Sequence, residues 1–160
     1  MKKLIIISDT HGNYRAVESL LPRIAENDYI VHLGDGAVDM REVRTQYPEK
    51  VYACNGNCDF FSPIPEEGIL EVECVRIFYC HGHKYRVKSE LTRLAQAAKE
   101  KGCDIALYGH THQADITEID GVTLINPGSF KRSVENGGSY CYLVINREKF
   151  TPVIVGESVY

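Results

Sequence analysis

Five short polar motifs, each placed just after an apolar run, contain the side chains of this chain that could do chemistry. In chain order they are Asp9-Thr10-His11, Gly34-Asp35, Gly56-Asn57-Cys58-Asp59, His81-Gly82-His83 and Gly109-His110-Thr111-His112. Carboxylate, imidazole and amide ligands without a thiolate suit Mn, Fe, Zn or Ni. A single Asp-x-His is equally compatible with a turn capped by an aspartate, because Asp and Gly favour turns. The five motifs together predict a metal centre.

The apolar runs before these motifs predict strands that would hold them at one edge. Leu4 to Ile7 are four consecutive aliphatics, which indicates a strand covered on both faces. Further strands are expected over 28–33, 50–54, 75–80 and 104–108, each ending at one of the motifs. Strands alternating with helices over the first half indicate parallel pairing, and sites form at the carboxyl edge of such sheets.

The helices between these strands follow from apolar spacing and capping residues. One is expected from Asn13 as N-cap to Glu26, kinked at Pro22 or divided there into two short helices. A second should cover roughly 38–47, and a third should begin at Ser89 as N-cap and end at Gly102.

The second half of the chain is mostly β. We expect hairpins from 69–73 with 75–80 and from 115–119 with 122–125, the latter turning at Asp120-Gly121, and closing strands over 140–145 and 151–155. Two sheets in one domain should pack face to face. The predicted fold class is α/β, an αββα sandwich of two mixed sheets flanked by helices, with residues 1–160 forming a single domain.

Composition excludes several classes of protein. The net charge of −4 lacks the basic footprint of a nucleic-acid coat protein, and 44% hydrophobic with 25% charged residues argues against disorder. No stretch approaches the roughly 18 apolar residues of a membrane span, and the apolar run after Met1-Lys2-Lys3 is too short for a signal peptide. The cysteines form no C-x-x-C pair and are expected to be reduced thiols. We therefore expect a cytoplasmic protein without a membrane partner.

The ordered motifs resemble those of the calcineurin-like metallophosphoesterase superfamily, and the small size with Gly-Asn-Cys-Asp resembles its YfcE-like phosphodiesterase branch. The resemblance runs from Ile5 to Ser129 and into the closing strands. It implies two divalent transition metals, Mn first and Ni, Fe or Zn as alternatives. It implies that one metal takes Asp9, His11, Asp35 and His112, and that the second takes Asp35, Asn57, His81 and His110.

This ligand set predicts phosphoester hydrolysis. A shared carboxylate holds two cations roughly 3.5 to 4 Å apart, the separation that clamps a phosphoryl group. Two divalent cations against the charges of Asp9 and Asp35 leave about +2, which attracts phosphate to an acidic chain. We expect a phosphodiesterase in which a metal-bridging hydroxide attacks phosphorus.

Catalytic roles are expected for Asn57, Cys58, Asp59, His81 and His83. The family often has a histidine, thought to steady the transition state or protonate the leaving group, where this chain has Cys58. A thiol is a poor substitute, so substrates whose leaving groups need little protonation, or help from His83, are expected. A metal ligand, a proton donor and a surface residue all stay open for His83. Asp59 either matches the family's acidic position or caps a turn.

Four other residues are weighed separately. His32 lies inside a predicted strand, where a structural or supporting role outweighs metal ligation. Asn126 belongs to a loop that is expected to pack, with its side chain near the site. Lys131 and Arg132 could contact a phosphate, although a solvated basic pair is the simpler interpretation.

Two rival functions use the same residues or the same fold. A phosphomonoesterase or nucleotide phosphatase would need the same metals. A non-catalytic protein-binding scaffold, similar to a retromer subunit, would be expected to lose metal histidines, and this chain keeps four. The expected partner is a small phosphoester, with nucleic acid only as a possible substrate, and a homodimer stays open.

Overall fold

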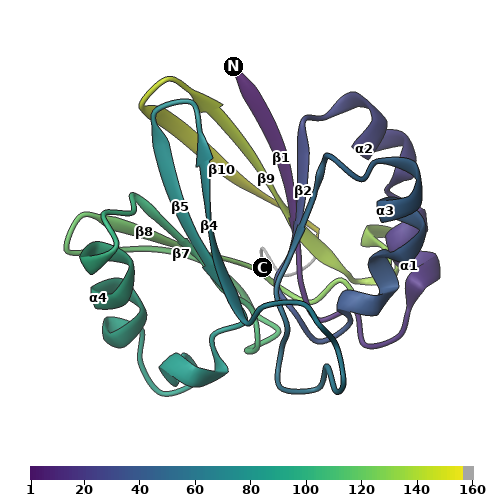
Figure 1. The fold of residues 1–160 in the computed structure, drawn as a ribbon, viewed down its shortest axis with the longest axis horizontal. Helices are drawn as coiled ribbons and strands as arrows, with labels where there is room; N and C mark the ends of the chain where they lie inside the picture. Colours follow the sequence, from purple (N-terminus) through teal and green to yellow (C-terminus); the bar gives the residue numbers. More distant parts are fainter. Residues whose placement is uncertain (157–160) are drawn as a thin grey trace.

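Two five-stranded β-sheets pack face to face in the computed structural model, which describes residues 1–156 (Figure 1). In spatial order the first sheet contains β10 (Lys149–Gly156), β9 (Ser139–Asn146), β1 (Lys2–Ile7), β2 (Tyr29–His32) and β3 (Val51–Ala53). The second contains β4 (Glu67–Val72), β5 (Val75–Cys80), β6 (Ile105–Leu107), β8 (Val122–Pro127) and β7 (Ala114–Ile119). Helices lie on both outer faces, so the predicted αββα sandwich is confirmed.

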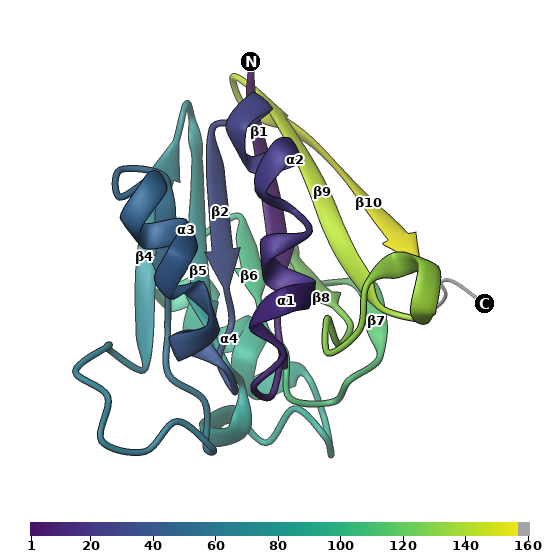
Figure 2. The same ribbon diagram turned by 90° about the vertical axis from the view of Figure 1, so that its right-hand side faces the viewer.

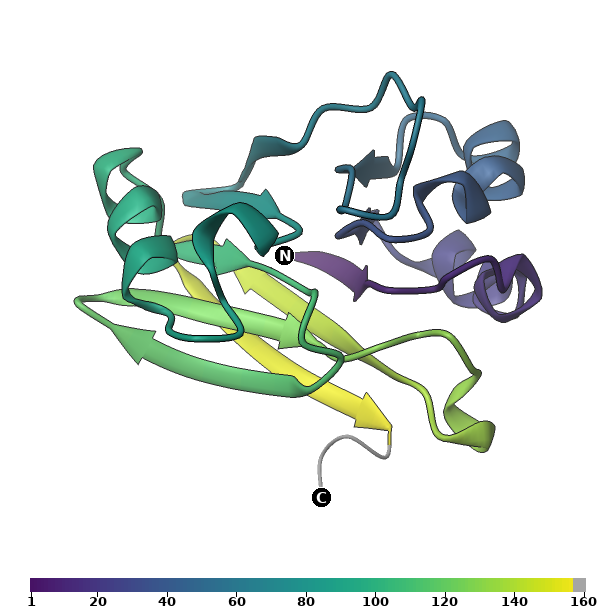
Figure 3. The same cartoon turned by 90° about the horizontal axis from the view of Figure 1, so that it is seen from below.

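Parallel pairing brings the motif-bearing strand ends to one edge. In the first sheet β1, β2 and β3 are neighbours and parallel, and in the second β5 is parallel to β6. β6 is also parallel to β8, and antiparallel pairs, including the predicted hairpin of β7 with β8, complete both sheets. The carboxyl ends of parallel strands meet at the same edge. Figure 3 views the molecule from below Figure 1, where the loops after these strands gather.

The side chains of β1 alternate between two apolar layers, which explains its four consecutive aliphatics. Leu4 and Ile6 pack in the core between the two sheets, whereas Ile5 and Ile7 pack against the helices of the first sheet. All four are at most 1% exposed. Burying an aliphatic side chain contributes about 1.5 to 3 kcal/mol. A third apolar cluster lies between the second sheet and its helix.

Three helices cover the outer face of the first sheet, as Figure 2 shows. The predicted helix after Asn13 is divided into α1 (Tyr14–Glu18) and α2 (Leu21–Glu26), with Pro22 in the first turn of α2. Proline is tolerated there because the amide that it lacks would have no partner. The Asn13 side chain accepts from the amide of Ala16, which confirms it as an N-cap.

The next helical segment is a 3-10 turn, η1 (Ala37–Met40), followed by α3 (Arg41–Gln46). Two further 3-10 turns are η2 (His83–Tyr85) and η3 (Val134–Asn136). Within residues 1–156, no helix combines the length and the apolar character needed to cross a membrane.

Helix α4 (Thr92–Glu100) packs on the second sheet, and its predicted start was wrong. Its N-cap is Leu91, without a side-chain cap. The amide of Ser89 instead donates to the carbonyl of Arg86, so Ser89 belongs to the preceding turn. The predicted end at Gly102 is confirmed: Gly102 follows the last turn at φ +69°, a conformation that suits glycine, and its amide donates to the carbonyl of Lys99.

Candidate metal centre

The loops after β1, β2, β5 and β6 bring six of the seven predicted metal ligands together. Ligand atoms of Asp9, His11 and His112 lie within 4.8 Å of one another. The same holds for Asp35, His81 and His110. Each group combines residues from both sheets, because the carboxyl ends of the strands that carry them lie at the same edge of the packed sheets.

The buried carboxylate of Asp9 leaves one oxygen free for a ligand. Its Oδ2 accepts from Ser8 Oγ (2.6 Å) and from the amide of His110 (3.0 Å). Within residues 1–156, its fully buried Oδ1 has no hydrogen-bond donor, although the Nε2 of His112 lies 3.2 Å away. An uncompensated buried carboxylate oxygen is costly. A cation at this point would remove that cost, so Asp9 fits a metal site.

Asp35 is oriented in the same manner. Its Oδ1 accepts from the amide of Cys58 (2.8 Å), and its Oδ2 lies 3.2 Å from His81 Nε2 and 3.9 Å from His11 Nε2. Burial disfavours the charge, but the His81 imidazole and the Cys58 amide outweigh it and hold the pKa of Asp35 well below its usual range. Its free oxygen therefore faces histidines from both ligand groups.

The histidines approach in two pairs. His11 Nε2 is 3.2 Å from His112 Nε2, and His81 Nε2 is 3.2 Å from His110 Nδ1. Two nitrogens bound to one ion at about 2.0 to 2.1 Å lie roughly 3 to 3.5 Å apart, so both separations fit shared coordination. Burial and the neighbouring His81 lower the pKa of His110 to about 4, which keeps its nitrogens neutral at pH 7.

Five of the predicted ligands have a left-handed backbone. The φ angles of Asp9, His11, Asp35, His110 and His112 lie between +45° and +71°. Residues other than glycine seldom adopt this conformation, which costs of order 1 kcal/mol or more and clusters at functional sites. The chain accepts this strain at the positions that point side chains into the centre.

Asp59 organises the loops rather than entering either group. Its carboxylate accepts from the amides of Asp35 (2.7 Å), Gly36 (2.9 Å), Ala37 (3.3 Å) and Gly56 (2.8 Å). These bonds connect the loop after β2 to the loop after β3. This geometry matches the turn-capping alternative, because the Asp59 carboxylate accepts from backbone amides, including that of Asp35, and joins neither ligand group.

Asn57 and Cys58 lie on the exposed side of the same loop. The Asn57 amide donates to Cys58 Sγ (3.6 Å), and the Cys58 sulfur lies within 4.8 Å of ligand atoms of His11 and Asp35. A side chain at Gly56 would collide with Asp35 Oδ1, which explains the glycine there. Loss of hydration and the negative charge of Asp35 raise the pKa of the Cys58 thiol.

His83 lies near the second ligand group without joining it. Its ring centroid is 5.4 Å from that of His81 and 6.2 Å from that of His110. Its buried Nδ1 has no hydrogen-bond partner among residues 1–156. Partial burial and the neighbouring His81 lower its pKa, so the ring is neutral at pH 7.

A buried polar chain behind the site was not predicted. His32 accepts from the amide of Gly34 through Nδ1 and contacts Thr10 Oγ1 through Nε2 (2.9 Å). Thr10 donates to Asp39 Oδ2 (2.6 Å), which also accepts from the amide of Gly12. His32 is therefore structural, as expected. The sequence holds no signal for the role of Asp39, because its partners lie almost 30 positions away.

The end of β8 and the loop after it support both groups of ligands, and Asn126, which was expected in the loop, lies in the strand because it pairs with β7. Asn126 is fully buried and donates through Nδ2 to the Gly109 carbonyl and to Thr111 Oγ1, flanking His110. Ser129 Oγ donates to the carbonyl of Asp9. Asn126 therefore holds a ligand loop, whereas Lys131 and Arg132 are exposed, as the simpler interpretation predicted.

Comparisons with known proteins agree with this geometry. Residues 1–148 match the model of the calcineurin-like phosphoesterase superfamily domain. The probable metallophosphoesterase YsnB of Bacillus subtilis is 32% identical over 92% of this chain and 87% of its own length. The phosphodiesterase YfcE of Escherichia coli is 29% identical over 87% and 84%.

Solved structures share the fold. A predicted phosphoesterase from Streptococcus pneumoniae superposes with a TM-score of 0.79 at 28% identity, covering 96% of this chain and 88% of that one. Vps29 of Entamoeba histolytica complexed with Zn²⁺ gives 0.78 at 21% identity, covering 95% and 91%, a likeness of fold alone. The family match and the YsnB similarity confirm the predicted family, and the chain belongs to the calcineurin-like phosphoesterase superfamily.

Proposed function

We propose that this protein is a metal-dependent phosphodiesterase with two transition-metal ions. One ion would be held by Asp9, His11, Asp35 and His112, and the second by Asp35, Asn57, His81 and His110. The observation that carries the proposal is the pair of buried carboxylates, Asp9 and Asp35, each anchored through one oxygen and offering the other to imidazole nitrogens. Mn is the expected metal because carboxylate, amide and imidazole ligands suit it, with Ni, Fe or Zn as alternatives.

The chemistry assigned to the centre follows from these ligands. Bound divalent cations would supply hydroxide from water near neutral pH and offset charge on the phosphoryl oxygens. Asp9 and Asp35 set the net charge of the loaded centre to about +2, which attracts a phosphodiester anion. Hydrogen bonds from Ser8 and from the Cys58 amide orient both carboxylates before any substrate binds.

Proton delivery to the leaving group is the weak part of this site. The Cys58 thiol, with its raised pKa, is a poor acid and a weak hydrogen-bond donor. His83 lies beside His81 and His110, but its lowered pKa leaves it neutral at pH 7, so it holds no extra proton to give to a leaving group. We therefore propose a preference for diesters whose leaving groups need little protonation. The YfcE similarity supports diesters over monoesters.

Metal binding alone does not separate an enzyme from a scaffold, because the E. histolytica Vps29 is itself described as complexed with Zn²⁺. The test therefore measures metal content and turnover together. The protein is stripped with a chelator, reloaded with Mn, Ni, Zn or Fe(II), and assayed with bis(4-nitrophenyl) phosphate and 4-nitrophenyl phosphate. We expect two bound ions per chain and faster diester than monoester hydrolysis.

Each other outcome rejects one part of the proposal. One ion or none after Mn loading contradicts the dinuclear centre. Two ions without hydrolysis of either ester favour the scaffold, and faster monoester hydrolysis favours the phosphomonoesterase.

We also propose that the protein is cytoplasmic, which its six free cysteine thiols support. The small phosphoester partner and a homodimer also stay proposals.

A further inference from the structure

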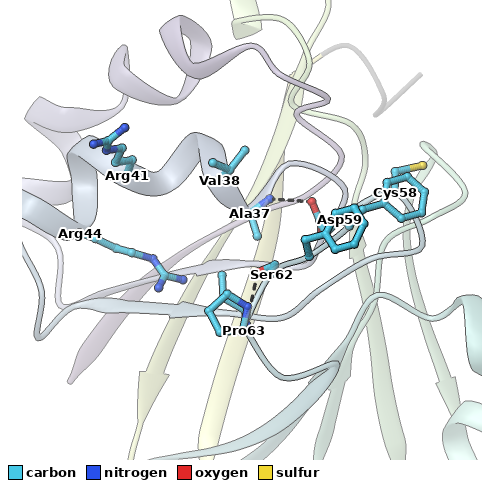
Figure 4. A pocket seen from close by; sticks show the side chains of 11 residues that line it. Ala37, Val38, Arg41, Arg44, Cys58, Asp59, Ser62 and Pro63 are labelled. Carbon is cyan, nitrogen blue, oxygen red and sulfur yellow. Dashed lines mark hydrogen bonds between the residues drawn. The ribbon is translucent and has the colours of Figure 1, made fainter.

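A groove of about 590 Å³ opens beside the candidate metal centre, between η1 with α3 on one side and residues 58–64 on the other (Figure 4). Its volume lies within the range of pockets that hold small organic ligands. Cys58 belongs both to the lining of this groove and to the group formed with His11 and Asp35. A substrate whose phosphate lies at the metal centre would therefore extend directly into the groove.

One wall of the groove presents an unpaired cation. Figure 4 shows the half-buried Arg44 side chain extending from α3 toward Pro63, whereas Arg41 extends away from it. Within residues 1–156, the Arg44 guanidinium has no hydrogen bond or ion pair with a protein group. A guanidinium is always charged and matches phosphate geometry, so this position suits a phosphate beyond the one at the metals.

The opposite wall presents exposed aromatic rings. Phe60 is 77% exposed and Phe61 is fully exposed, directly after the Cys58-Asp59 segment. Phe61 also has a left-handed backbone, with φ +57°. Exposed rings at the mouth of a polar site are suited to stacking on a planar base, and such stacking is indifferent to base identity. Val38 and Ile64 add apolar surface.

We propose that the substrate is a short nucleotide phosphodiester with a second phosphate, and that the groove binds the nucleoside and phosphate next to the scissile bond. The scissile phosphate would lie at the metal centre, the adjoining base against Phe60 and Phe61, and the next phosphate at Arg44. This inference deepens the proposed phosphodiesterase and rests on it. Hydrolysis adds water to phosphorus and breaks one P–O ester bond, giving a phosphomonoester and an alcohol.

The test compares dinucleotides that differ by one terminal phosphate. The Mn-loaded full chain is assayed with ApA, pApA and ApAp, and with bis(4-nitrophenyl) phosphate as a reference. Because a charge-assisted hydrogen bond is among the stronger ones, we expect kcat/KM for pApA or ApAp to exceed that for ApA by about 10-fold or more. In Arg44→Gln this ratio should fall to near one.

Controls separate recognition from folding. Arg23→Gln removes the same charge from an exposed position on α2 that does not line the groove. This variant should keep the wild-type ratio of kcat/KM between pApA or ApAp and ApA. The double variant Phe60→Ala, Phe61→Ala should lower kcat/KM for all dinucleotides by a similar factor and leave the ratio unchanged. Thermal unfolding and metal content confirm that each variant is folded and loaded.

The failures are distinguishable. If the wild type hydrolyses no diester at all, the proposed function is wrong. If it hydrolyses bis(4-nitrophenyl) phosphate but treats the three dinucleotides alike, or if Arg44→Gln keeps the ratio, the nucleotide proposal alone is overturned. A dimer in sedimentation that the Phe60→Ala, Phe61→Ala variant abolishes would instead assign the groove to a second copy of this chain.

Discussion

The imidazole of His81 donates Nδ1–H to the carbonyl oxygen of Leu33 across 2.7 Å, from the end of β5 in one sheet to the end of β2 in the other. Because a carbonyl only accepts, Nδ1 carries the proton, and in the neutral ring Nε2 is free to bind a cation. That Nε2 lies 3.2 Å from Asp35 Oδ2. The packing of the two sheets thus decides which nitrogen of His81 faces the centre.

The first prediction concerns Asp35, the carboxylate that faces both groups of histidines. Asp35→Asn keeps the acceptor for the Cys58 amide but removes the charge. We expect bound metal to fall below two ions per chain and diester turnover to fall by about 100-fold or more. Metal analysis and steady-state rates after Mn loading measure both.

Asp28→Asn is the matched control, because Asp28 is a surface carboxylate that pairs with Lys2 and lies outside the ligand groups. It should leave metal content and rate near wild type. Wild-type turnover in Asp35→Asn would rule out the bridging role.

The second prediction is that Asp59 stabilises the site through backbone amides. Asp59→Ala leaves the amides of Asp35 and Gly56 without their carboxylate acceptor, and we expect the free energy of unfolding to fall by roughly 2 to 4 kcal/mol. Urea unfolding measures the change. Glu135→Ala, an exposed site in η3, should change it by less than about 0.5 kcal/mol. Equal effects from the two substitutions would remove the organising role of Asp59.

Much of the fold could be predicted because its signals are local. The aliphatic run of β1 and the Asp120-Gly121 hairpin each depend on a few neighbouring residues. The strand ends that carry the candidate ligands could also be predicted, since parallel pairing places Asp9 and Asp35 at one edge of the first sheet. That His81, from the second sheet, meets Asp35 depends on how the two sheets pack.

The rest depends on contacts between distant parts of the chain. Ser89 has the residue type of an N-cap, but its amide is used by the turn at Arg86. Thr10 and Asp39 are 29 positions apart, and nothing in their neighbours indicates their hydrogen bond. The left-handed backbone of Asp9 likewise cannot be predicted from its residue type, because tertiary contacts impose this conformation.

The third prediction uses the buried His32. Burial lowers its pKa to about 4, whereas an unfolded histidine titrates near 6.5. Below pH 6.5 the unfolded chain binds the extra proton and the folded chain does not, so the contribution is complete above pH 6.5 and is lost as pH falls toward 4. We expect this loss to reach about 3 kcal/mol at most. Urea unfolding of metal-free protein between pH 7 and 4.5 measures it.

His32→Asn provides the control, because asparagine offers an oxygen to the Gly34 amide and does not titrate in this range. The variant will be less stable at every pH, but its stability should fall less steeply with acid than that of the wild type. Both proteins are measured without metal, so that His110, whose pKa is also lowered, contributes equally to the two pH profiles. Parallel pH profiles would show that His32 is not the group responsible.

The fourth prediction is that Cys58→His raises activity on substrates with poor leaving groups more than on nitrophenyl esters. An imidazole with an ordinary pKa near 6.5 donates a proton close to neutrality. The pKa of an ordinary thiol is higher than that of imidazole, and the pKa of the Cys58 thiol is raised further. General acid help is worth about 100-fold or more only where the departing oxygen needs its proton. Nitrophenolate departs without one, so its ester should gain little.

A competing account holds that a larger ring at position 58 would distort the Asn57 ligand and slow both substrates together. The structure favours tolerance, because the Cys58 side chain is exposed and it is the backbone amide of this residue, unchanged by substitution, that anchors Asp35. Rates of the variant on an alkyl and a nitrophenyl phosphodiester at saturating Mn separate the two accounts. A larger gain on the alkyl ester supports proton donation by the new histidine. Equal changes on both esters rule it out, and a parallel fall in metal affinity would assign the effect to Asn57.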